Sequence, residues 1–280
     1  MEFEPSIARH YTHGALEKAI RDALASVGKE LDALTPADLA PVDEFHIGGR
    51  QATADLAAQL AIKPGAHLLD IGSGLGGASR FFAQERGCRV TGIDLTEEYV
   101  RTAEWLASLL RLDGRVSYRH GSGLALPFPA ESFDGAYMLH VGMNIAAKAA
   151  LFAEVRRVLK GGGDFAIYDV MREQDGEIIF PVPWATVAAT SFVESPSTYR
   201  RLLEAAGFEI MMERSRRDFA VEFFQQMRRR TAESGGPPPL GLQILMGTSA
   251  PEKVANMITN LESGVVGPTE IIARAIQGAE

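Results

Sequence analysis

Apolar residues along the chain follow two alternating patterns, short continuous runs and longer stretches of helical spacing. The runs HLLDIG (67–72), RVTGIDL (89–95), VSYRHGS (116–122), SFDGAYMLHV (132–141) and GGGDFAIYDVM (161–171) are typical of buried strands. Amphipathic helical stretches separate or follow them, namely 77–87, 97–110, 148–160 and the helix that opens the helix–strand segment 196–215. Strands that alternate with helices predict an α/β fold, with a parallel sheet covered by helices on both faces.

Both ends of the chain and one internal segment depart from this alternation. Residues 7–40 are predicted to be helical, with apolar positions at Leu16, Ile20, Leu24, Val27 and Leu31, and the prolines Pro36 and Pro41 indicate turns. Residues 172–198 are apolar and rich in proline, and residues 220–233 form a predicted helix before the loop SGGPPPLG and a further helical stretch. We therefore expect an N-terminal helical cover (1–60), a core (61–215) with an insertion at about 172–198, and a C-terminal helical extension (216–280).

Composition and charge narrow the class of protein. The chain has 280 residues, 46% of them hydrophobic, and a net charge of −8 with a pI of about 5.4, which argues against a nucleic-acid partner. The single cysteine, Cys88, excludes an internal disulfide, and the six histidines show no metal-binding spacing. The polar, acidic N-terminus is unlike a signal peptide, and no apolar run approaches the roughly 20 residues of a membrane span. These features predict a cytoplasmic protein without a membrane partner and leave a homo-oligomer open.

A glycine cluster follows the first predicted strand, in LLDIGSGLGG (68–77). The spacing of Gly72, Gly74 and Gly77 fits the dinucleotide fingerprint, and that of Gly72, Gly74 and Gly76 fits another nucleotide loop equally well. Strand, glycine loop and helix form the context that nucleotide binding requires, because glycine lets the backbone approach the ligand. A tight structural turn is the alternative.

Two acidic residues bear on the ligand of this loop. Asp94 ends the second strand, about 20 residues past the loop, where a carboxylate can accept hydrogen bonds from both ribose hydroxyls. Asp70 precedes the glycines, where a carboxylate would oppose a pyrophosphate and would suit a ligand with a positive group. The amino end of S-adenosylmethionine carries an ammonium and a sulfonium. A structural cap is the other role open to Asp70.

Four segments, LLDIGSGLGG, VTGIDLT, LPFPAESFDGAYMLH and EVRRVLKGGGDFAIYDV, resemble successive motifs of the class I S-adenosylmethionine-dependent methyltransferases, over about residues 45–215. The resemblance implies a Rossmann-like sheet of seven strands, one of them antiparallel, with S-adenosylmethionine as cofactor. It places the glycine loop at the methionyl group, Asp94 at the ribose and Ser122–Gly123 at the adenine. The expected cofactor residues are Asp70, Gly72, Ser73, Gly74, Gly76, Gly77, Asp94, Leu95, Ser122, Gly123 and His140. The family often has Asp in place of Ser122 and Pro in place of Gly161.

The nearest resemblance within the family is to enzymes acting on small molecules, such as the sarcosine/dimethylglycine and phosphoethanolamine methyltransferases. Methyl transfer is an in-line displacement, so a general base is needed only when the acceptor must lose a proton. His140, at the end of the fourth strand, is the expected base or orienting residue, and His46 in DEFHIGG is a weaker candidate. The expected acceptor residues, in the N-terminal lid, the fourth strand end and the insertion, are Tyr11, Phe45, His46, Asn144, Trp184 and Phe192.

Two other functions compete with methyl transfer to an N, O or C atom of a small molecule. An NAD-dependent Rossmann oxidoreductase would share the glycine loop, but it predicts an apolar residue at the position of Asp70. A non-catalytic S-adenosylmethionine-binding module would share the whole fold.

Overall fold

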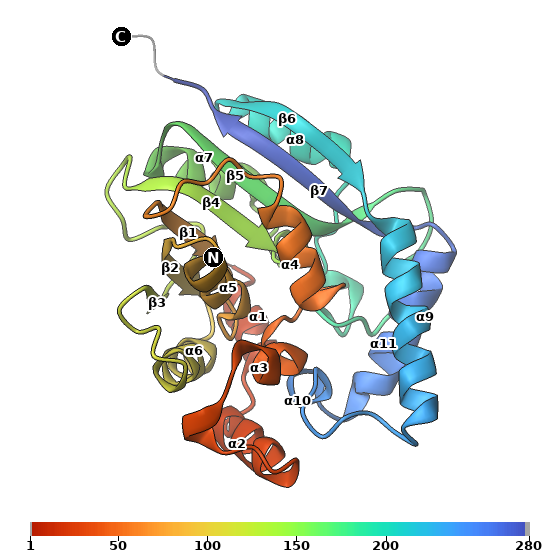
Figure 1. Ribbon diagram of the computed structural model, residues 1–280. Helices are drawn as coiled ribbons and strands as arrows, with labels where there is room; N and C mark the ends of the chain where they lie inside the picture. Colours follow the sequence, from red (N-terminus) through yellow and green to blue (C-terminus); the bar gives the residue numbers. More distant parts are fainter. Residues whose placement is uncertain (1, 278–280) are drawn as a thin grey trace.

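A single sheet of seven strands organises the computed structural model, which describes residues 2–277 (Figure 1). The strand order is β3-β2-β1-β4-β5-β7-β6, and β7 runs antiparallel to both of its neighbours while the other pairs are parallel. The strands are β1 (His67–Ile71), β2 (Arg89–Asp94), β3 (Val116–His120), β4 (Phe133–Leu139), β5 (Leu159–Arg172), β6 (Phe208–Ser215) and β7 (Val266–Ala275). This order confirms the expected Rossmann-like, mostly parallel sheet.

Helices precede, connect and follow the strands. The α-helices are α1 (Glu4–Tyr11), α2 (Leu16–Ser26), α3 (Pro36–Asp43), α4 (Gly49–Ala57), α5 (Gly77–Glu85), α6 (Glu97–Leu109), α7 (Lys148–Val158), α8 (Pro196–Ala205), α9 (Arg217–Glu233), α10 (Gln243–Met246) and α11 (Ala250–Glu262). Short 3-10 turns occur at Leu31–Ala33, Gly142–Asn144, Ala188–Thr190 and Gly247–Ser249. None of the helices in the described part of the chain has the length and apolar character needed to cross a membrane.

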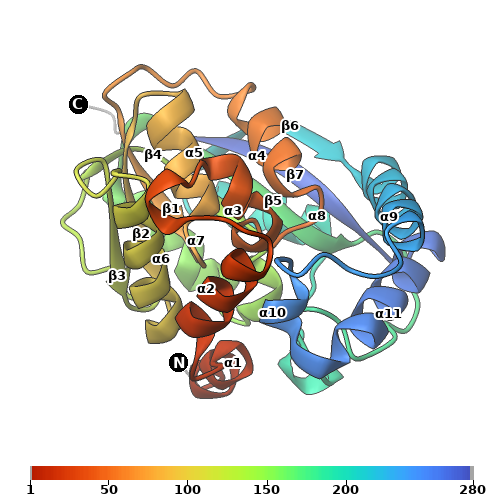
Figure 2. The same cartoon turned by 60° about the horizontal axis from the view of Figure 1, so that its bottom comes forward.

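The helices from the two ends of the chain gather beyond the carboxyl ends of the parallel strands. Turning the molecule brings α1, α2 and α10 forward together, although more than 200 residues of sequence separate α2 from α10 (Figure 2). Helices α9 and α11 pack against each other and against β7. The carboxyl ends of the parallel strands point toward these helices, so the N-terminal and C-terminal segments enclose the edge where ligands bind in such sheets.

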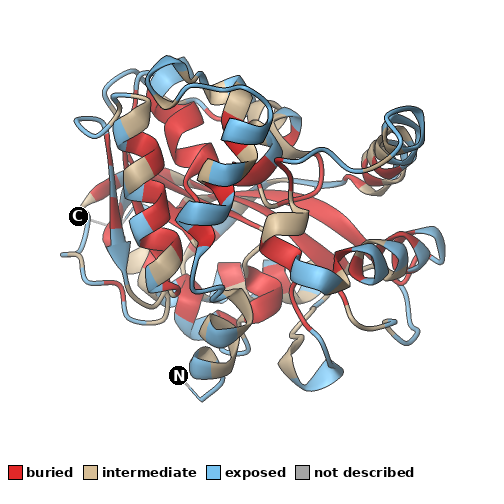
Figure 3. Cartoon of the chain, turned by 90° about the horizontal axis from the view of Figure 1, so that it is seen from below, coloured by how far each residue is buried: buried red, intermediate tan, exposed pale blue. Residues whose placement is uncertain are grey.

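The inner strands of the sheet are buried on both faces, whereas the edge strands β3 and β6 have exposed positions (Figure 3). In β1, Leu68 packs with residues of α4, α5 and α6 on one face, and Leu69 packs with α7 and α8 on the other. Successive side chains of a strand point to opposite faces, so a strand covered on both sides has a continuous apolar run. This is why the first five strands could be predicted from their composition.

The C-terminal extension is not wholly helical, which corrects the expectation for residues 216–280. Residues Val266–Ala275 form β7, which pairs with β5 and β6 and completes the sheet. Its carboxylate at Glu270 is fully buried and is paired with Arg214 at 2.5 Å and Arg216 at 3.0 Å. An acidic residue inside the segment weakens the strand signal. The long-range ion pairs, together with a hydrogen bond of 2.9 Å from Nε2 of Gln59, make its burial tolerable.

The N-terminal segment is helical but broken, unlike the expected continuous pattern. Leu16, Ile20 and Leu24 are buried on α2, whereas Val27 is 45% exposed after the helix ends. Pro36 and Pro41, expected in turns, lie within α3. Pro36 fits because the first turn of a helix needs no backbone N–H there, and Thr35 and Asp38 form a capping box around it.

Candidate active site

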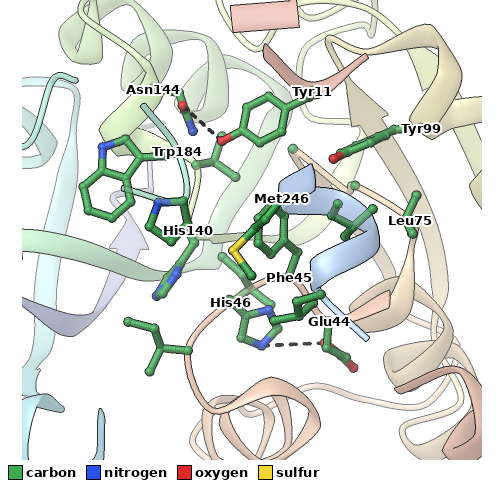
Figure 4. Close-up of a pocket in the computed structure, with 18 of the residues that line it drawn as sticks. Tyr11, Glu44, Phe45, His46, Leu75, Tyr99, His140, Asn144, Trp184 and Met246 are labelled. Carbon is green, nitrogen blue, oxygen red and sulfur yellow. Dashed lines mark hydrogen bonds and ion pairs between the residues drawn. The ribbon is translucent and has the colours of Figure 1, made fainter. Parts of the chain in front are cut away.

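A cavity of about 1200 Å³ opens at the carboxyl ends of the strands and is enclosed by helices from both ends of the chain (Figure 4). One part is lined by the glycine loop, by Asp70 and by Asp94. The lining also includes apolar side chains, among them Met246, Met257 and Trp184. Pockets for one small molecule occupy about 300–1000 Å³. The cavity therefore has room for two ligands, a polar one at the sheet and an apolar one beneath the helices.

The glycine loop follows β1 in a conformation that only glycine adopts easily. Gly72 has φ +68°, and a Cβ atom there would lie 2.4 Å from the side chain of Val141. The next residue, Ser73, lines the cavity, and its hydroxyl is buried with no hydrogen-bond partner in residues 2–277. The loop thus presents backbone and an unsatisfied hydroxyl to a ligand.

Asp94 lies where the sequence predicts, at the end of β2 and in the cavity wall. Its Oδ2 accepts a hydrogen bond of 2.8 Å from the backbone N–H of Gly74, and its Oδ1 accepts one of 2.8 Å from Thr96. Each carboxylate oxygen retains a second lone pair for a ligand hydroxyl. Asp94 therefore joins the glycine loop to the proposed ribose position, and its neighbour Leu95 lines the same part of the cavity.

Asp70 also lines the cavity, but whether its carboxyl is charged depends on pH. Burial raises the pKa of its carboxyl to about 7, and the hydroxyls of Ser79 (2.6 Å) and Tyr137 (3.1 Å) donate to its Oδ2 and oppose that rise. A carboxyl of this pKa is about half ionised at neutral pH, and a cationic ligand beside it would favour the ionised form. The preference for a positive group stays a prediction, and the raised pKa of Asp70 adds a pH dependence to it.

Three expected cofactor residues lie outside the cavity wall. Gly76 faces the hydroxyl of Tyr118, and Gly77 faces the backbone of Asp43, in each case so closely that a Cβ atom would lie within 2.4 Å of it. The hydroxyl of Ser122 donates to the carboxylate of Glu4 on α1, and the neighbouring Gly123 lines the cavity instead. In this structure the two glycines permit close packing, and Ser122 fastens the N-terminal segment.

His140 follows β4 and lines the cavity beside Tyr168 and His46. It has φ +55°, and its backbone N–H donates to the carbonyl of Tyr168 at 2.7 Å, which fixes the turn that aims the side chain. Burial holds the pKa of its imidazole well below the usual range. The ring is neutral at physiological pH, and its buried Nε2 has no partner within the described residues.

The structure brings together most of the expected acceptor residues. The hydroxyl of Tyr11 on α1 donates to Oδ1 of Asn144 at 3.2 Å, so the N-terminal segment contacts the end of β4 directly (Figure 4). Phe45 and Trp184 line the cavity as well. Phe192 does not line the cavity; its ring packs against that of Phe3, a lining residue, with centroids 4.9 Å apart.

Sequence reasoning missed the wall formed by the C-terminal helices. Apolar residues of α9, α10 and α11 close the cavity, namely Phe223, Phe224, Met227, Leu245, Met246, Val254 and Met257. The apolar positions of the predicted helix 220–233 were the available signal, but they do not say which surface the helix covers. The polar residues Glu44 and Thr53, buried behind DEFHIGG, were also missed.

Unsatisfied buried polar atoms concentrate at this cavity. Four of the six side-chain atoms that are buried without a partner in residues 2–277 belong to cavity residues, namely Glu44 Oε1, Ser73 Oγ, Tyr99 OH and His140 Nε2. Buried polar groups of folded proteins are rarely left unpaired. Their clustering indicates a ligand with polar groups at several points.

Comparison with known proteins points to methyltransferases, as the sequence motifs do. Residues 69–167 match the family described as "Methyltransferase domain". Sterol 24-C-methyltransferase ERG6B of Gibberella zeae is 35% identical over 114 residues, which are 41% of this chain and 30% of that protein. Erythromycin 3''-O-methyltransferase of Saccharopolyspora erythraea is 33% identical over 190 residues, 62% of each chain. The chain thus spans less than two thirds of the length of these curated relatives.

Among solved structures, a geranyl diphosphate methyltransferase in complex with GPP and sinefungin superposes with a TM-score of 0.73 at 18% identity, covering 99% of this chain and 100% of that one. At this identity the likeness shows the shared fold. The family match over residues 69–167 and the shared fold both make this chain similar to methyltransferases. The glycine loop lies in the stretch that matches the methyltransferase domain family, so the oxidoreductase alternative is not favoured.

Proposed function

We propose that the protein transfers a methyl group from S-adenosylmethionine to a predominantly apolar small molecule. The observation that carries this proposal is that one cavity is lined both by polar groups at the glycine loop and by apolar side chains of α9, α10 and α11. The unsatisfied hydroxyl of Ser73 and the carboxylates of Asp70 and Asp94 are among these polar groups. The erythromycin and sterol methyltransferases, by their names, act on molecules with large apolar surfaces.

The residues at the sheet fit S-adenosylmethionine. Asp94 would accept from the ribose hydroxyls, the loop 72–74 would contact the methionyl group, and Asp70 would face the ammonium, whose charge would keep the carboxyl ionised. The bound cofactor supplies a methyl group activated by its sulfonium.

The remaining residues position the acceptor and exclude water. Tyr11 and Asn144 connect α1 to the end of β4 and close one side, while Trp184 and Met246 provide apolar walls. Orientation of two reactants can supply effective molarities of about 10⁵ to 10⁸ M, so positioning accounts for much of the rate enhancement. His140, neutral and unpartnered at Nε2, offers a lone pair or a hydrogen bond to a polar group of the acceptor.

An acceptor panel with S-adenosylmethionine carrying a deuterated methyl group tests this function. The panel should contain apolar hydroxyl compounds (sterols, macrolide aglycones, naphthols) and polar amines (sarcosine, phosphoethanolamine), with products detected by mass spectrometry. We expect label in apolar compounds. Label only in the polar amines would contradict the apolar acceptor, and no transfer at all would favour a non-catalytic binding module.

We also propose a cytoplasmic location and no nucleic-acid partner. The single cysteine suits a reducing compartment, and the net charge of −8 disfavours a polyanion. A homo-oligomer is compatible with this proposal, and light scattering on the purified chain measures the oligomeric state.

A further inference from the structure

A chain of polar side chains links two residues of DEFHIGG (43–49) to α4 at the wall of the cavity. Oγ1 of Thr53 on α4 donates to Oε2 of Glu44 at 2.8 Å, and it lies 3.1 Å from Nε2 of His46. All three residues are buried, with 3% of Glu44, 6% of His46 and none of Thr53 exposed. Such a chain links one imidazole nitrogen through a hydroxyl to a carboxyl group.

The surroundings of the His46 imidazole assign its protons. Nε2 lies 3.1 Å from the carbonyl oxygen of Gly49, which can only accept, so Nε2 carries the proton. The hydroxyl of Thr53 donates its hydrogen to Glu44, so its oxygen accepts a hydrogen bond from Nε2 of His46. Gly48 makes this turn possible, because at φ +89° a Cβ atom there would lie 2.4 Å from the ring of Phe219.

The second imidazole nitrogen faces the cavity. Nδ1 of His46 has no hydrogen-bond partner within the described residues and is not among the fully buried polar atoms, while His46 lines the cavity. Figure 4 shows one ring nitrogen directed at Glu44 and the other directed away from it. With Nε2 protonated, Nδ1 holds a lone pair that a ligand can reach.

We propose that His46 is the base that removes a proton from an acceptor hydroxyl group, with Thr53 and Glu44 as its proton relay. This inference rests on the proposed methyl transfer. The hydroxyl proton moves to Nδ1 of His46, the Nε2 proton moves to Oγ1 of Thr53, and the proton of Thr53 moves to Oε2 of Glu44. The acceptor oxygen keeps the electron pair that forms the bond to the methyl carbon.

The relay changes which group determines the base strength. Burial lowers the pKa of His46 to about 4, whereas burial and the neighbouring Asp43 raise the pKa of Glu44 to about 8. A proton is thus held far more firmly by Glu44 than by His46. The other charged groups that act on Glu44 are Arg80 and Arg50, and both oppose the rise.

The ionised form of Glu44 is the one that can accept a proton. The relay is therefore ready above a pH of about 8 and blocked as pH falls below it, unless ligands shift this value. Besides Glu44, whose Oε2 lies 3.6 Å from Nε2, the titratable rings that face His46 are those of His140 and Tyr168, with centroids 5.9 Å and 6.1 Å away. Burial lowers the pKa of His140 and raises that of Tyr168, so both are neutral across this range.

This arrangement selects among acceptor atoms. A neutral amine or an alkene carbon attacks the methyl group without first losing a proton, so a buried relay would be of no use to it. A hydroxyl is a poor nucleophile until its proton leaves. The geometry therefore points to an oxygen acceptor on an apolar skeleton.

The first test is nuclear magnetic resonance of protein labelled with ¹⁵N-histidine and saturated with S-adenosylhomocysteine, which requires no acceptor. We expect His46 to be neutral, with its proton on Nε2, near pH 7. Replacement of Thr53 by Val should shift the Nε2 resonance, and Thr53→Ser should restore it. A cationic His46, or a proton on Nδ1 in the wild-type protein, would overturn the relay whatever the reaction is.

The second test is kinetic and uses 1-naphthol and its more acidic nitro derivatives as acceptors, at saturating S-adenosylmethionine. Thr53→Val and Glu44→Gln should lower kcat about 100-fold for 1-naphthol, the lower end of the range of general base catalysis, but much less for nitronaphthols that ionise unaided. The rise of rate with pH should disappear in Glu44→Gln, and Thr53→Ser should recover most of the activity.

Thr102→Val is the matched control, because Thr102 is equally buried on α6 and lies outside the cavity wall. Thermal unfolding of each variant separates lost folding from lost catalysis. Equal losses for all naphthols would overturn the relay, and methylation of amines without any hydroxyl acceptor would overturn the oxygen preference while leaving methyl transfer intact. A wild-type protein that methylates no acceptor of either kind contradicts the proposed function itself, and the inference with it.

Discussion

The carboxylate of Asp94 and the backbone N–H of Gly74 are joined by a hydrogen bond of 2.8 Å. The residue that ends β2 thereby holds the loop that follows β1. One carboxylate consequently serves the shape of the glycine loop as well as the proposed ribose contact.

Asp94→Ala should weaken binding of S-adenosylhomocysteine, because it removes a charge-assisted hydrogen-bond acceptor and releases the loop. The expected loss is about 1.5–3 kcal/mol, or roughly 10- to 100-fold in Kd, by isothermal titration calorimetry. Asp134→Ala is the control, since Asp134 also accepts a backbone N–H at 2.8 Å but lies near the start of β4, away from the cavity. Unchanged affinity in Asp94→Ala would show that Asp94 does not contact the ligand.

The affinity for S-adenosylhomocysteine should rise with pH because of Asp70. Its pKa of about 7 means that the ligand's ammonium meets an ionised carboxyl only as pH passes this value. Titrations between about pH 6 and pH 8 should show a falling Kd, and Asp70→Asn should remove this dependence. A wild-type Kd that does not vary with pH would mean that Asp70 does not face the ammonium.

The raised pKa of Asp70 also predicts that its contribution to the stability of the protein without ligand falls as pH rises. Folding raises the pKa of Asp70 from 3.8 to about 7, so the folded state binds the proton more tightly. This contribution to stability is present below the lower value and is lost as pH rises through the higher one. Thermal unfolding of Asp70→Asn should therefore vary less with pH than that of the wild type.

His140→Asn should reduce kcat/KM for the acceptor by about 10-fold or more and leave the Kd for S-adenosylhomocysteine nearly unchanged. Asparagine is chosen because it tolerates the positive φ of this position, +55°, better than alanine. Equal losses in affinity and rate would instead identify His140 as a cofactor contact.

Met246→Trp should fill part of the apolar half of the cavity. We expect KM for the acceptor to rise about 10-fold, a size effect typical of hydrophobic pockets, with no change in the Kd for S-adenosylhomocysteine. Met211→Trp serves as control, because Met211 lies on β6, is 45% exposed and is remote from the cavity. Loss of cofactor affinity in Met246→Trp would place the cofactor, and not the acceptor, beneath α10.

Asp43→Asn should destabilise the protein by about 3–5 kcal/mol, because it leaves the buried guanidinium of Arg80 without its counter-ion. The pair is 2.6 Å apart, and both side chains are at most 5% exposed. The exposed pair of Lys18 and Asp22 offers the comparison, since Asp22→Asn should cost at most about 1 kcal/mol. Urea unfolding measures both, and similar losses would show that the buried pair adds little.

The strands β1 to β5 and the glycine loop could be predicted because their signals are local. A buried run, a glycine cluster and Asp94 all lie within 30 residues of one another. The strand β7 could not, because its place in the sheet depends on pairing Glu270 with arginines more than 50 residues away. The bond between Ser122 and Glu4, 118 residues apart, is equally invisible to sequence patterns.

The same contrast between local and long-range signals applies to the residues of the cavity. His46 and His140 could be selected by position, but the tautomer of His46 depends on Gly49 and Thr53, which the turn at Gly48 brings beside it. The apolar wall from α9 to α11 depends on how the C-terminal helices fold back across the sheet edge. Sequence thus identifies the cofactor half better than the acceptor half.

Calorimetric titration of the purified protein with S-adenosylhomocysteine and, separately, with NADH tests the central claim most directly. The account predicts tight binding of S-adenosylhomocysteine that weakens in Asp94→Ala, and no comparable binding of NADH. Tight binding of NADH without binding of S-adenosylhomocysteine would contradict it.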